Sequence, residues 1–185
     1  MPLPLPSGPL APAQPGDPHF AVWSLLESVC DPEIPVVNLR EMGILRAVQN
    51  TPQGLEVVIT PTYSGCPAMR QMNDDVLTAL RDAGVAARVV TRLAPAWSTD
   101  WMTPEAHAKL RAYGIAPPLA CATTGTAQVI QFDSKKRAAS AIATPACPQC
   151  GSKNTTEISH FGSTACKALY RCLRCLETFD YFKPY

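Results

Sequence analysis

Two C-x-x-C pairs near the C-terminus constrain the fold of this chain more than any other feature. Cys147 and Cys150 form the first pair, Cys172 and Cys175 form the second, and 21 residues separate the pairs. Each pair can present two sulfurs to one tetrahedral ion from a tight turn, and the spacing is typical of a four-cysteine zinc site. A segment of about 40 residues cannot fold on an apolar core alone. We therefore expect a bound metal to hold it folded.

We expect this metal to be zinc rather than iron in a rubredoxin-like site, because the second pair lacks the Cys-Pro-x-Cys-Gly form. Short β-patterned runs around the pairs predict a three-stranded ribbon: Thr155–Ser159, Leu169–Arg171 and Thr178–Phe182. Cys166 is left over, and three roles remain open for it: an extra ligand in place of one of the four, a ligand of a second metal, or an idle thiol.

A third cysteine position lies at the junction of a strand and a helix. The run Leu55–Thr60 is rich in β-branched residues and short enough to be a buried strand. Pro67 suits the first position of a helix, and apolar residues then recur at steps of three and four: Met69, Met72, Val76, Leu80 and Ala83. Cys66 therefore lies near a helix N-terminus. There the backbone N–H groups and the macrodipole favour the thiolate, the form that attacks electrophiles and binds soft metals. The alternative is a small buried apolar residue.

Two acids stand in a segment that prolines stiffen. Asp31 and Glu33 belong to the run Asp31-Pro32-Glu33-Ile34-Pro35, whose prolines exclude a helix or a central strand. We expect a rigid extended loop over residues 31–39, which would hold carboxylates in fixed positions. In the alternative interpretation Asp31 caps the turn and Glu33 is solvated.

The remaining elements predict an α/β (α+β) fold. A helix should start at Asp17-Pro18 and end at Cys30, and strands are expected at Ile44–Val48, Leu55–Thr60 and Val85–Thr91. The last two strands flank the helix that follows Cys66, so they should be parallel with a right-handed connection. This gives a small two-layer mixed sheet with helices on one face, followed by the C-terminal zinc ribbon.

Two further segments follow the third strand. Trp97 and Trp101 lie in an irregular stretch that is either a recognition surface or a flap covering the sheet, and we favour the flap. Thr103-Pro104-Glu105 has the cap, the proline and the first-turn acid of a helix start.

Composition divides the chain into four regions. Residues 1–17 form a proline-rich arm that we expect to be disordered, and residues 18–118 form the α/β domain. Residues 119–144 form a linker rich in Ala, Thr and Ser with one candidate strand, Gln128–Phe132, and residues 145–185 form the zinc ribbon.

Charge and targeting signals restrict the function classes. The formal net charge of +1 argues against bulk electrostatic binding to nucleic acid or to an anionic membrane. The N-terminal stretch has no lysine or arginine and no uninterrupted apolar core, unlike a secretory signal. We therefore expect the chain to stay in the cytoplasm. In that reducing compartment, paired cysteines are more often metal ligands or redox groups than disulfides.

Several of these features together resemble a known family. Asp31-Pro32-Glu33, Gly43 before a strand, and Thr60-(x)5-Cys66-Pro67 before a helix resemble the SufT-type iron–sulfur assembly domain, over roughly residues 18–115. The tail, in residues 161–172 and 179–183, resembles the PaaD (also PaaJ) branch of that family. That branch comprises accessory subunits of the multicomponent phenylacetyl-CoA epoxidase of aerobic phenylacetate degradation.

The resemblance implies roles for particular residues. Cys66 corresponds to the reactive or cluster-handling cysteine of the family, and Asp31 and Glu33 correspond to its acidic motif. Glu41-Met42-Gly43 stands where the wider family tends to carry Asp-Leu-Gly, so the sequence departs from the family pattern there.

The function implied is that of a non-catalytic accessory subunit of phenylacetyl-CoA 1,2-epoxidase. It would assemble or repair the iron–sulfur or diiron centre of the oxygenase or reductase subunits, which would be its partners, and bind iron or a cluster transiently. A homodimer could complete a cluster with two copies of Cys66.

Two other function classes are weaker. In a thiol enzyme Cys66 would be the nucleophile and would need a general base, but none of the three histidines, His19, His107 and His160, lies in a motif that suggests one. A nucleic-acid reader would need a basic face with stacking aromatics, and the tail has only scattered lysine and arginine.

Overall fold

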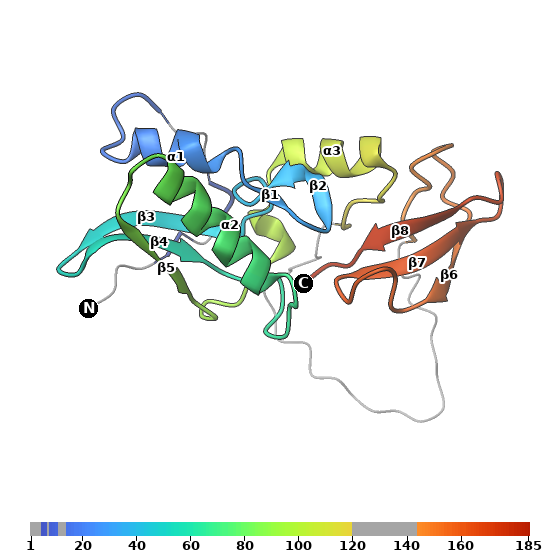
Figure 1. The fold of residues 1–185 in the computed structure, drawn as a ribbon. Helices are drawn as coiled ribbons and strands as arrows, with labels where there is room; N and C mark the ends of the chain where they lie inside the picture. Colours follow the sequence, from blue (N-terminus) through green and yellow to red (C-terminus); the bar gives the residue numbers. More distant parts are fainter. Residues whose placement is uncertain (1–4, 7, 11–13, 120–143) are drawn as a thin grey trace, which may run out of the picture.

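Two three-stranded sheets, one near each end of the chain, form the framework (Figure 1). The structure is a computed structural model that describes residues 5–6, 8–10, 14–119 and 144–185. The candidate strand Gln128–Phe132, most of the predicted linker and part of the predicted arm lie outside the described residues.

The first sheet has the order β3-β4-β5, with β3 (Leu45–Thr51), β4 (Gly54–Ile59) and β5 (Ala87–Thr91). β3 and β4 form an antiparallel hairpin, whereas β4 and β5 run parallel. Helix α2 (Met69–Asp82) connects the parallel pair. The predicted mixed sheet with a strand–helix–strand unit is therefore confirmed.

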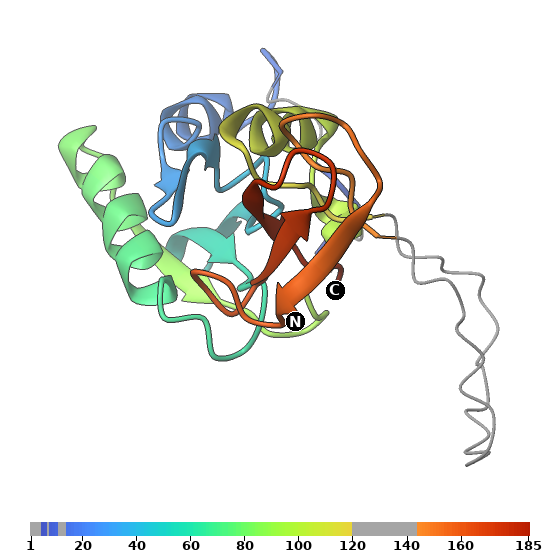
Figure 2. The same ribbon diagram turned by 90° about the vertical axis from the view of Figure 1, so that its right-hand side faces the viewer.

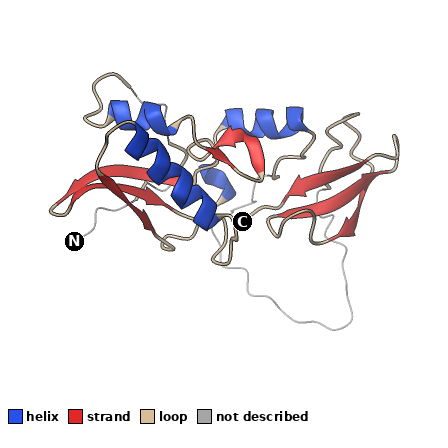
Figure 3. Cartoon of the chain, viewed as in Figure 1, coloured by secondary structure: helices blue, strands red, loops and turns tan. Residues whose placement is uncertain are grey.

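Helices α1 (Phe20–Leu26) and α2 cover one face of this sheet (Figures 1 and 3). Alternate residues of β4 point into the core below them, and the apolar face of α2 closes it, with these residues buried: Val57, Ile59, Met72, Val76 and Leu80. On the opposite face of β4, buried Glu56 pairs with Arg88 at 2.6 Å and with Arg92 at 3.1 Å. The sheet thus packs its apolar face on helices and closes its other face with ion pairs.

Helix α1 is shorter than predicted. It begins at Phe20 because the Asp17 side chain accepts from the backbone N–H of His19 at 2.7 Å and forms a turn before the helix. It ends at Leu26, and the Ser28 hydroxyl donates to the carbonyl of Leu25 at 2.8 Å. The expected extension to Cys30 was wrong, because Cys30 pairs in a strand.

The proline-stiffened acidic segment forms a short hairpin. β1 (Cys30–Asp31) pairs antiparallel with β2 (Ile34–Asn38), so the segment is extended as predicted but is paired rather than a free loop. A two-stranded edge sheet tolerates prolines because few of its N–H groups are needed for pairing. Helix α3 (Pro104–Tyr113) packs against β2 (Figure 1). It starts as predicted, with the Thr103 hydroxyl accepting from the N–H of Ala106 at 3.2 Å.

The tryptophan segment, which includes the short helix η1 (Thr99–Trp101), is a flap and not an exposed surface. Trp97 and Trp101 are buried, and the indole N–H of Trp97 donates to the carbonyl of Met42 at 3.0 Å. The guanidinium of buried Arg46 stacks 3.9 Å from the centroid of the Trp101 ring. Arg46 also donates to the carbonyls of Pro6 and Gly8, so this part of the predicted arm contacts the domain.

The second sheet is antiparallel, with β6 (Thr155–Ser159), β7 (Lys167–Cys172) and β8 (Thr178–Phe182) in that order. The three predicted strands are therefore confirmed. A small aromatic core of its own lies beneath them, in which the rings of Tyr170 and Tyr181 meet edge-on at 5.3 Å.

The ribbon is joined to the first domain by backbone pairing and by apolar packing. The N–H of Ala116 donates to the carbonyl of Asp180 at 2.8 Å, and the N–H of Phe182 donates to the carbonyl of Ala116 at 2.9 Å. Phe182 is fully buried in the core of the first domain, 6.0 Å from the ring of Trp97. Figure 1 shows β8 pointing at the first domain, with the C-terminus between the two sheets.

None of the helices in the described ranges has the length and apolarity that crossing a bilayer requires.

One glycine is required by the flap. Gly43 has a φ of +71°, and a Cβ there would lie 2.7 Å from both the Cβ and the carbonyl oxygen of Trp101. We expect Gly43→Ala to lower the free energy of unfolding by about 2–4 kcal/mol, from the left-handed backbone and the overpacking together. Denaturant titration with zinc in excess measures this.

Gly84→Ala is the matched control, because Gly84 has a φ of +68° and a Cβ added there would meet nothing within 4 Å. It should lower the free energy of unfolding by only about 1–2 kcal/mol, which is the cost of the left-handed backbone alone. Equal losses for the two variants would show that contact with Trp101 contributes nothing.

Candidate functional site

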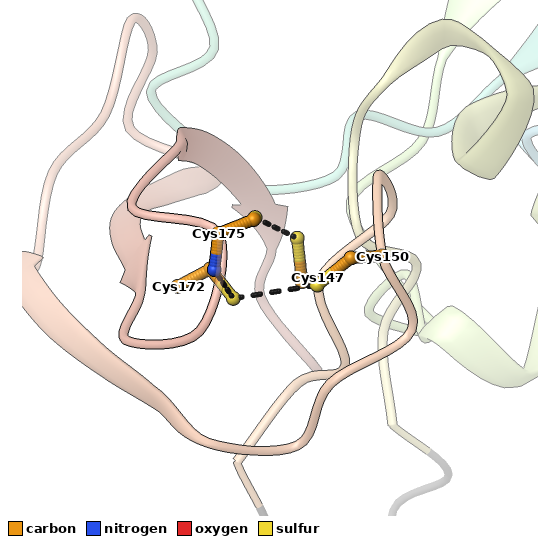
Figure 4. A group of neighbouring side chains, drawn as sticks. All are labelled: Cys147, Cys150, Cys172 and Cys175. Carbon is orange, nitrogen blue, oxygen red and sulfur yellow. Dashed lines mark hydrogen bonds between the residues drawn. The ribbon is translucent and has the colours of Figure 1, made fainter.

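The four cysteines of the two C-x-x-C pairs converge in the ribbon. Their sulfur atoms all lie within 4.8 Å of one another (Figure 4). The Sγ atoms of Cys147 and Cys175 are 3.7 Å apart, and those of Cys150 and Cys172 are 3.6 Å apart. A tetrahedron with zinc–sulfur bonds of about 2.3 Å has edges of about 3.8 Å. The donor set and its spacing therefore fit zinc, and four protein ligands leave no open position for catalysis.

The two cysteine turns are built alike. The N–H of Gly151 donates to the carbonyl of Cys147 at 2.9 Å, and the N–H of Leu176 donates to the carbonyl of Cys172 at 3.0 Å. Gly151 and Leu176 both follow the second cysteine of their pair, and both have left-handed backbones, with φ of 71° and 68°. The turn geometry that presents two sulfurs thus overrides the preference of a leucine for negative φ.

Backbone donors support the metal-binding sulfurs. The N–H groups of Arg174 and Cys175 point at the Sγ of Cys172, at 3.4 and 3.5 Å. Such donors stabilise a thiolate and fix its direction toward a metal.

The junction cysteine lies in the loop between β4 and α2. The helix begins at Met69 rather than at Pro67, so Cys66 precedes its first residue by three positions. The carbonyl of Cys66 accepts from the N–H of Met69 at 3.4 Å, and the backbone N–H groups of Ala68 and Met69 lower the pKa of its thiol. Cys66 is half-buried and packs against the main core. It therefore lies at a helix N-terminus, as predicted.

The expected thiolate is not favoured at Cys66. Burial raises the pKa of this thiol above its usual range, and the carboxylates of Glu33 and Asp31 raise it further. The hydrogen bonds from the backbone N–H groups oppose this rise without reversing it. The prediction from helix position was wrong because desolvation outweighs the dipole at a half-buried thiol.

The two acids come from the β1–β2 hairpin. Asp31 is buried, and its Oδ1 accepts from the N–H of Glu33 at 2.7 Å and of Ile34 at 3.1 Å, so it caps the turn. Glu33 is half-buried rather than solvated. Burial raises the pKa of both carboxyls, while the positive charge of Lys167 lowers it. The carboxylates of both acids raise the pKa of the Cys66 thiol, so the two acids and the thiol lie in one region of the first domain.

The ribbon contributes two further groups to this region: Cys166, for which the sequence left three roles open, and Lys167, which the sequence interpretation missed. Cys166 is buried and packs into the core of the first domain, and its sulfur lies 3.0 Å from the hydroxyl of Thr164. Lys167, also buried, pairs with Asp180 at 3.6 Å. Spacing gave no signal that these two residues belong near Asp31 and Glu33, because those acids are more than 100 positions away in the sequence.

Glu41, at which the sequence departs from the family pattern, has a structural role. Its carboxylate accepts from the N–H of Asn38 at 3.1 Å, while the Asn38 side chain accepts from the N–H of Glu41 at 2.8 Å. Lys109 of α3 donates to the same carboxylate at 2.7 Å. Glu41 therefore joins this turn to α3.

Solved structures resemble parts of the chain. A domain of unknown function, DUF59, from Bacillus anthracis is 27% identical, with a TM-score of 0.45, and the match covers 50% of this chain and 90% of that one. A protein of Mycobacterium tuberculosis associated with Fe–S complex assembly and repair is also 27% identical, with a TM-score of 0.32, over 58% of this chain and 98% of that one.

Two family models and one curated protein match the sequence. Residues 20–91 match the model of an iron–sulfur cluster assembly protein, and residues 131–183 match that of the PaaD zinc beta ribbon domain. A putative 1,2-phenylacetyl-CoA epoxidase subunit of Escherichia coli (strain K12) is 45% identical over 163 residues, which cover 88% of this chain and 90% of that protein. Identity at this level over nearly the whole of both chains shows that this chain belongs to the PaaD family, with an iron–sulfur assembly domain followed by a zinc ribbon.

Proposed function

We propose that this chain is an accessory subunit of a phenylacetyl-CoA 1,2-epoxidase system in phenylacetate degradation. In this role it assembles or repairs the iron–sulfur or diiron centre of the oxygenase or reductase subunits and does not itself epoxidise the ring. The name of the Escherichia coli relative and the match to an iron–sulfur assembly family support the proposal. The observation that carries it is that Asp31, Glu33 and Cys66 all lie within residues 20–91, which match the assembly family, and that both carboxylates act on the Cys66 thiol.

This group of side chains suits transient iron handling. A thiolate and two carboxylates are acceptable ligands for ferrous iron. Across the described residues, only the four ribbon cysteines bring three or more ligand atoms within 4.8 Å of one another. The Cys66 group is thus not a closed structural centre, and iron bound by few protein ligands can be passed on.

The raised pKa of Cys66 has a use in this role. A protonated thiol is a poor nucleophile and is oxidised slowly. An arriving iron ion displaces the proton, because metal binding requires the thiolate. The thiol then becomes a ligand only when its cargo is present.

We assign the zinc in the ribbon a structural role and propose that the ribbon docks the client oxygenase or reductase. Leu173 and Leu176 on the second cysteine turn are 49% and 61% exposed, which is consistent with a docking surface. A homodimer that pairs two copies of Cys66 is an alternative way to complete a cluster. We place this work in the cytoplasm, because a reducing compartment keeps paired cysteines available as metal ligands.

The thiol-enzyme alternative loses support. Among the described groups, no histidine acts on the Cys66 thiol. His160 instead pairs with Glu157 at 3.5 Å, and His107 lies on α3. A nucleophilic cysteine also needs a lowered pKa or an adjacent base, and Cys66 shows the opposite shift.

Cys66→Ser tests the proposal directly. Anaerobic reconstitution of the zinc-loaded chain with ferrous iron and sulfide should give visible charge-transfer absorption in the wild type and little in this variant, because the thiolate ligand is lost. Cys30→Ser is the matched control, since Cys30 is also a free cysteine of the first domain. Equal iron binding by Cys66→Ser and the wild type would refute the proposed function.

Glu33→Gln tests whether the acid faces the thiol. Because the Glu33 carboxylate raises the pKa of Cys66, its removal should lower that pKa and shift the pH midpoint of Cys66 alkylation downward. Mass spectrometry of the alkylated peptide measures the midpoint. Glu41→Gln, whose acid pairs with Lys109, should leave it unchanged, and an unchanged or raised midpoint in Glu33→Gln would contradict this arrangement.

Loss of one ribbon ligand should remove the metal. We expect about one zinc per wild-type chain and loss of that zinc in Cys147→Ser, together with unfolding of β6–β8, because binding of structural zinc supplies the folding free energy of such segments. Elemental analysis and circular dichroism measure both effects. Retention of a full equivalent of zinc in Cys147→Ser would contradict the assignment.

A further inference from the structure

The loop between β6 and β7 inserts a ribbon cysteine into the first domain. Cys166 is only 7% exposed and belongs to the apolar core that α1, α2 and the first sheet form. Its carbonyl accepts from the N–H of Lys183 at 3.0 Å, and the carbonyl of Ala165 accepts from the hydroxyl of Tyr185 at 3.3 Å. Figures 1 and 2 show this loop at the end of the ribbon that faces the first domain. The C-terminal segment therefore holds the backbone at Cys166 in place.

The same two carboxylates act on both thiols, which belong to or pack against one core. Asp31 and Glu33 act electrostatically on Cys66 and also on Cys166. The phenol of Tyr63, three residues before Cys66, is also acted on by both thiols. A cysteine of the first domain and a cysteine of the ribbon are thus both acted on by one pair of acids.

A buried cation completes the group. Lys167 is 4% exposed and acts on Asp31, Glu33 and Cys166. Its ammonium also pairs with Asp180 of β8 at 3.6 Å, which holds it in the ribbon. Thr164 lies in the same region: its hydroxyl is 3.0 Å from the Cys166 sulfur, and it lowers the pKa of Glu33.

We propose that Cys166 is a second thiolate ligand for the iron or iron–sulfur unit that Cys66 receives, and that Lys167 compensates the negative charge of the completed site. The inference rests on the proposed function, because it assumes that Cys66 handles iron. It means that one chain supplies both sulfurs, one from each domain, and that a second copy of Cys66 is not needed.

Charge explains why the site can rest without metal. Two thiolates and two carboxylates would place four negative charges in a partly buried region, and Lys167 alone could not offset them. Burial raises the pKa of both thiols, so both rest protonated. Binding of a ferrous ion or a cluster displaces both protons and supplies the missing positive charge.

Burial also argues against a purely structural role for Cys166. An apolar filler belongs among apolar side chains, because polar neighbours gain nothing from it. Although Cys166 packs in the apolar core of the first domain, its sulfur lies 3.0 Å from the Thr164 hydroxyl, and the charges of Glu33, Lys167 and Asp31 act on it.

The test uses the full zinc-loaded chain under anaerobic conditions, with ferrous iron and sulfide as the probe. Wild type, Cys166→Ser, Cys66→Ser and Cys30→Ser are compared by bound iron per chain and by the number of sulfur ligands in iron X-ray absorption spectra. We expect Cys166→Ser to weaken iron binding by at least about tenfold. Removal of a group that only supports a metal ligand already lowers metal affinity by about 10- to 100-fold, and loss of a ligand should lower it at least as much. Cys30→Ser should match the wild type.

The outcomes separate this inference from the proposed function. If Cys66→Ser loses iron while Cys166→Ser binds it with wild-type affinity and sulfur count, this inference is overturned and the proposed function stands. If both variants bind iron like the wild type, the proposed function fails, and this inference fails with it.

A second measurement does not depend on the folding of any variant. A short bifunctional alkylating reagent applied to the metal-free Cys66 site of the zinc-loaded wild type should link the peptides that carry Cys66 and Cys166, and prior loading with iron and sulfide should block the link. Absence of this crosslink from the mass spectrum, when each thiol reacts singly, would overturn the proposal.

Discussion

The two backbone hydrogen bonds of Ala116 fix where the ribbon meets the first domain, and the rest of the site depends on that contact. They join a residue just after α3 to Asp180 and Phe182 at the end of β8. Phe182 then packs into the core of the first domain. The ribbon has only a small core of its own and could not bury this side chain. Since Cys166 sits opposite this end of β8, the same contact determines its distance from Cys66.

Local sequence patterns predicted which helices and strands form, but they did not predict where every one of them begins and ends. The proline of Thr103-Pro104 marks the true start of α3, because the threonine hydroxyl caps the first turn. Pro18 and Pro67 each stand two residues before the first helical residue, and neither α1 nor α2 has a side-chain cap. Proline thus predicted a helix start accurately only where a capping hydroxyl came with it.

The protonation state of Cys66 could not be predicted from its place in the sequence. Position at a helix N-terminus lowers a thiol pKa, but the sequence does not show how deeply the sulfur is buried or which acids face it. The metal-binding role of the C-x-x-C pairs could be predicted without knowing their burial, because two cysteines separated by two residues share one turn. Cys166 illustrates the opposite case, because its neighbours Asp31 and Glu33 come from the other end of the chain. Only the folded structure brings them together.

Non-covalent contacts between described residues hold the ribbon in place. They come from Ala116, from Phe182 beside Trp97, and from the carbonyl of Tyr185, which accepts from the N–H of Thr99. These contacts join the ribbon to the first domain independently of the covalent connection between them. A cut in the chain between Leu119 and Thr144 would therefore leave every one of them intact.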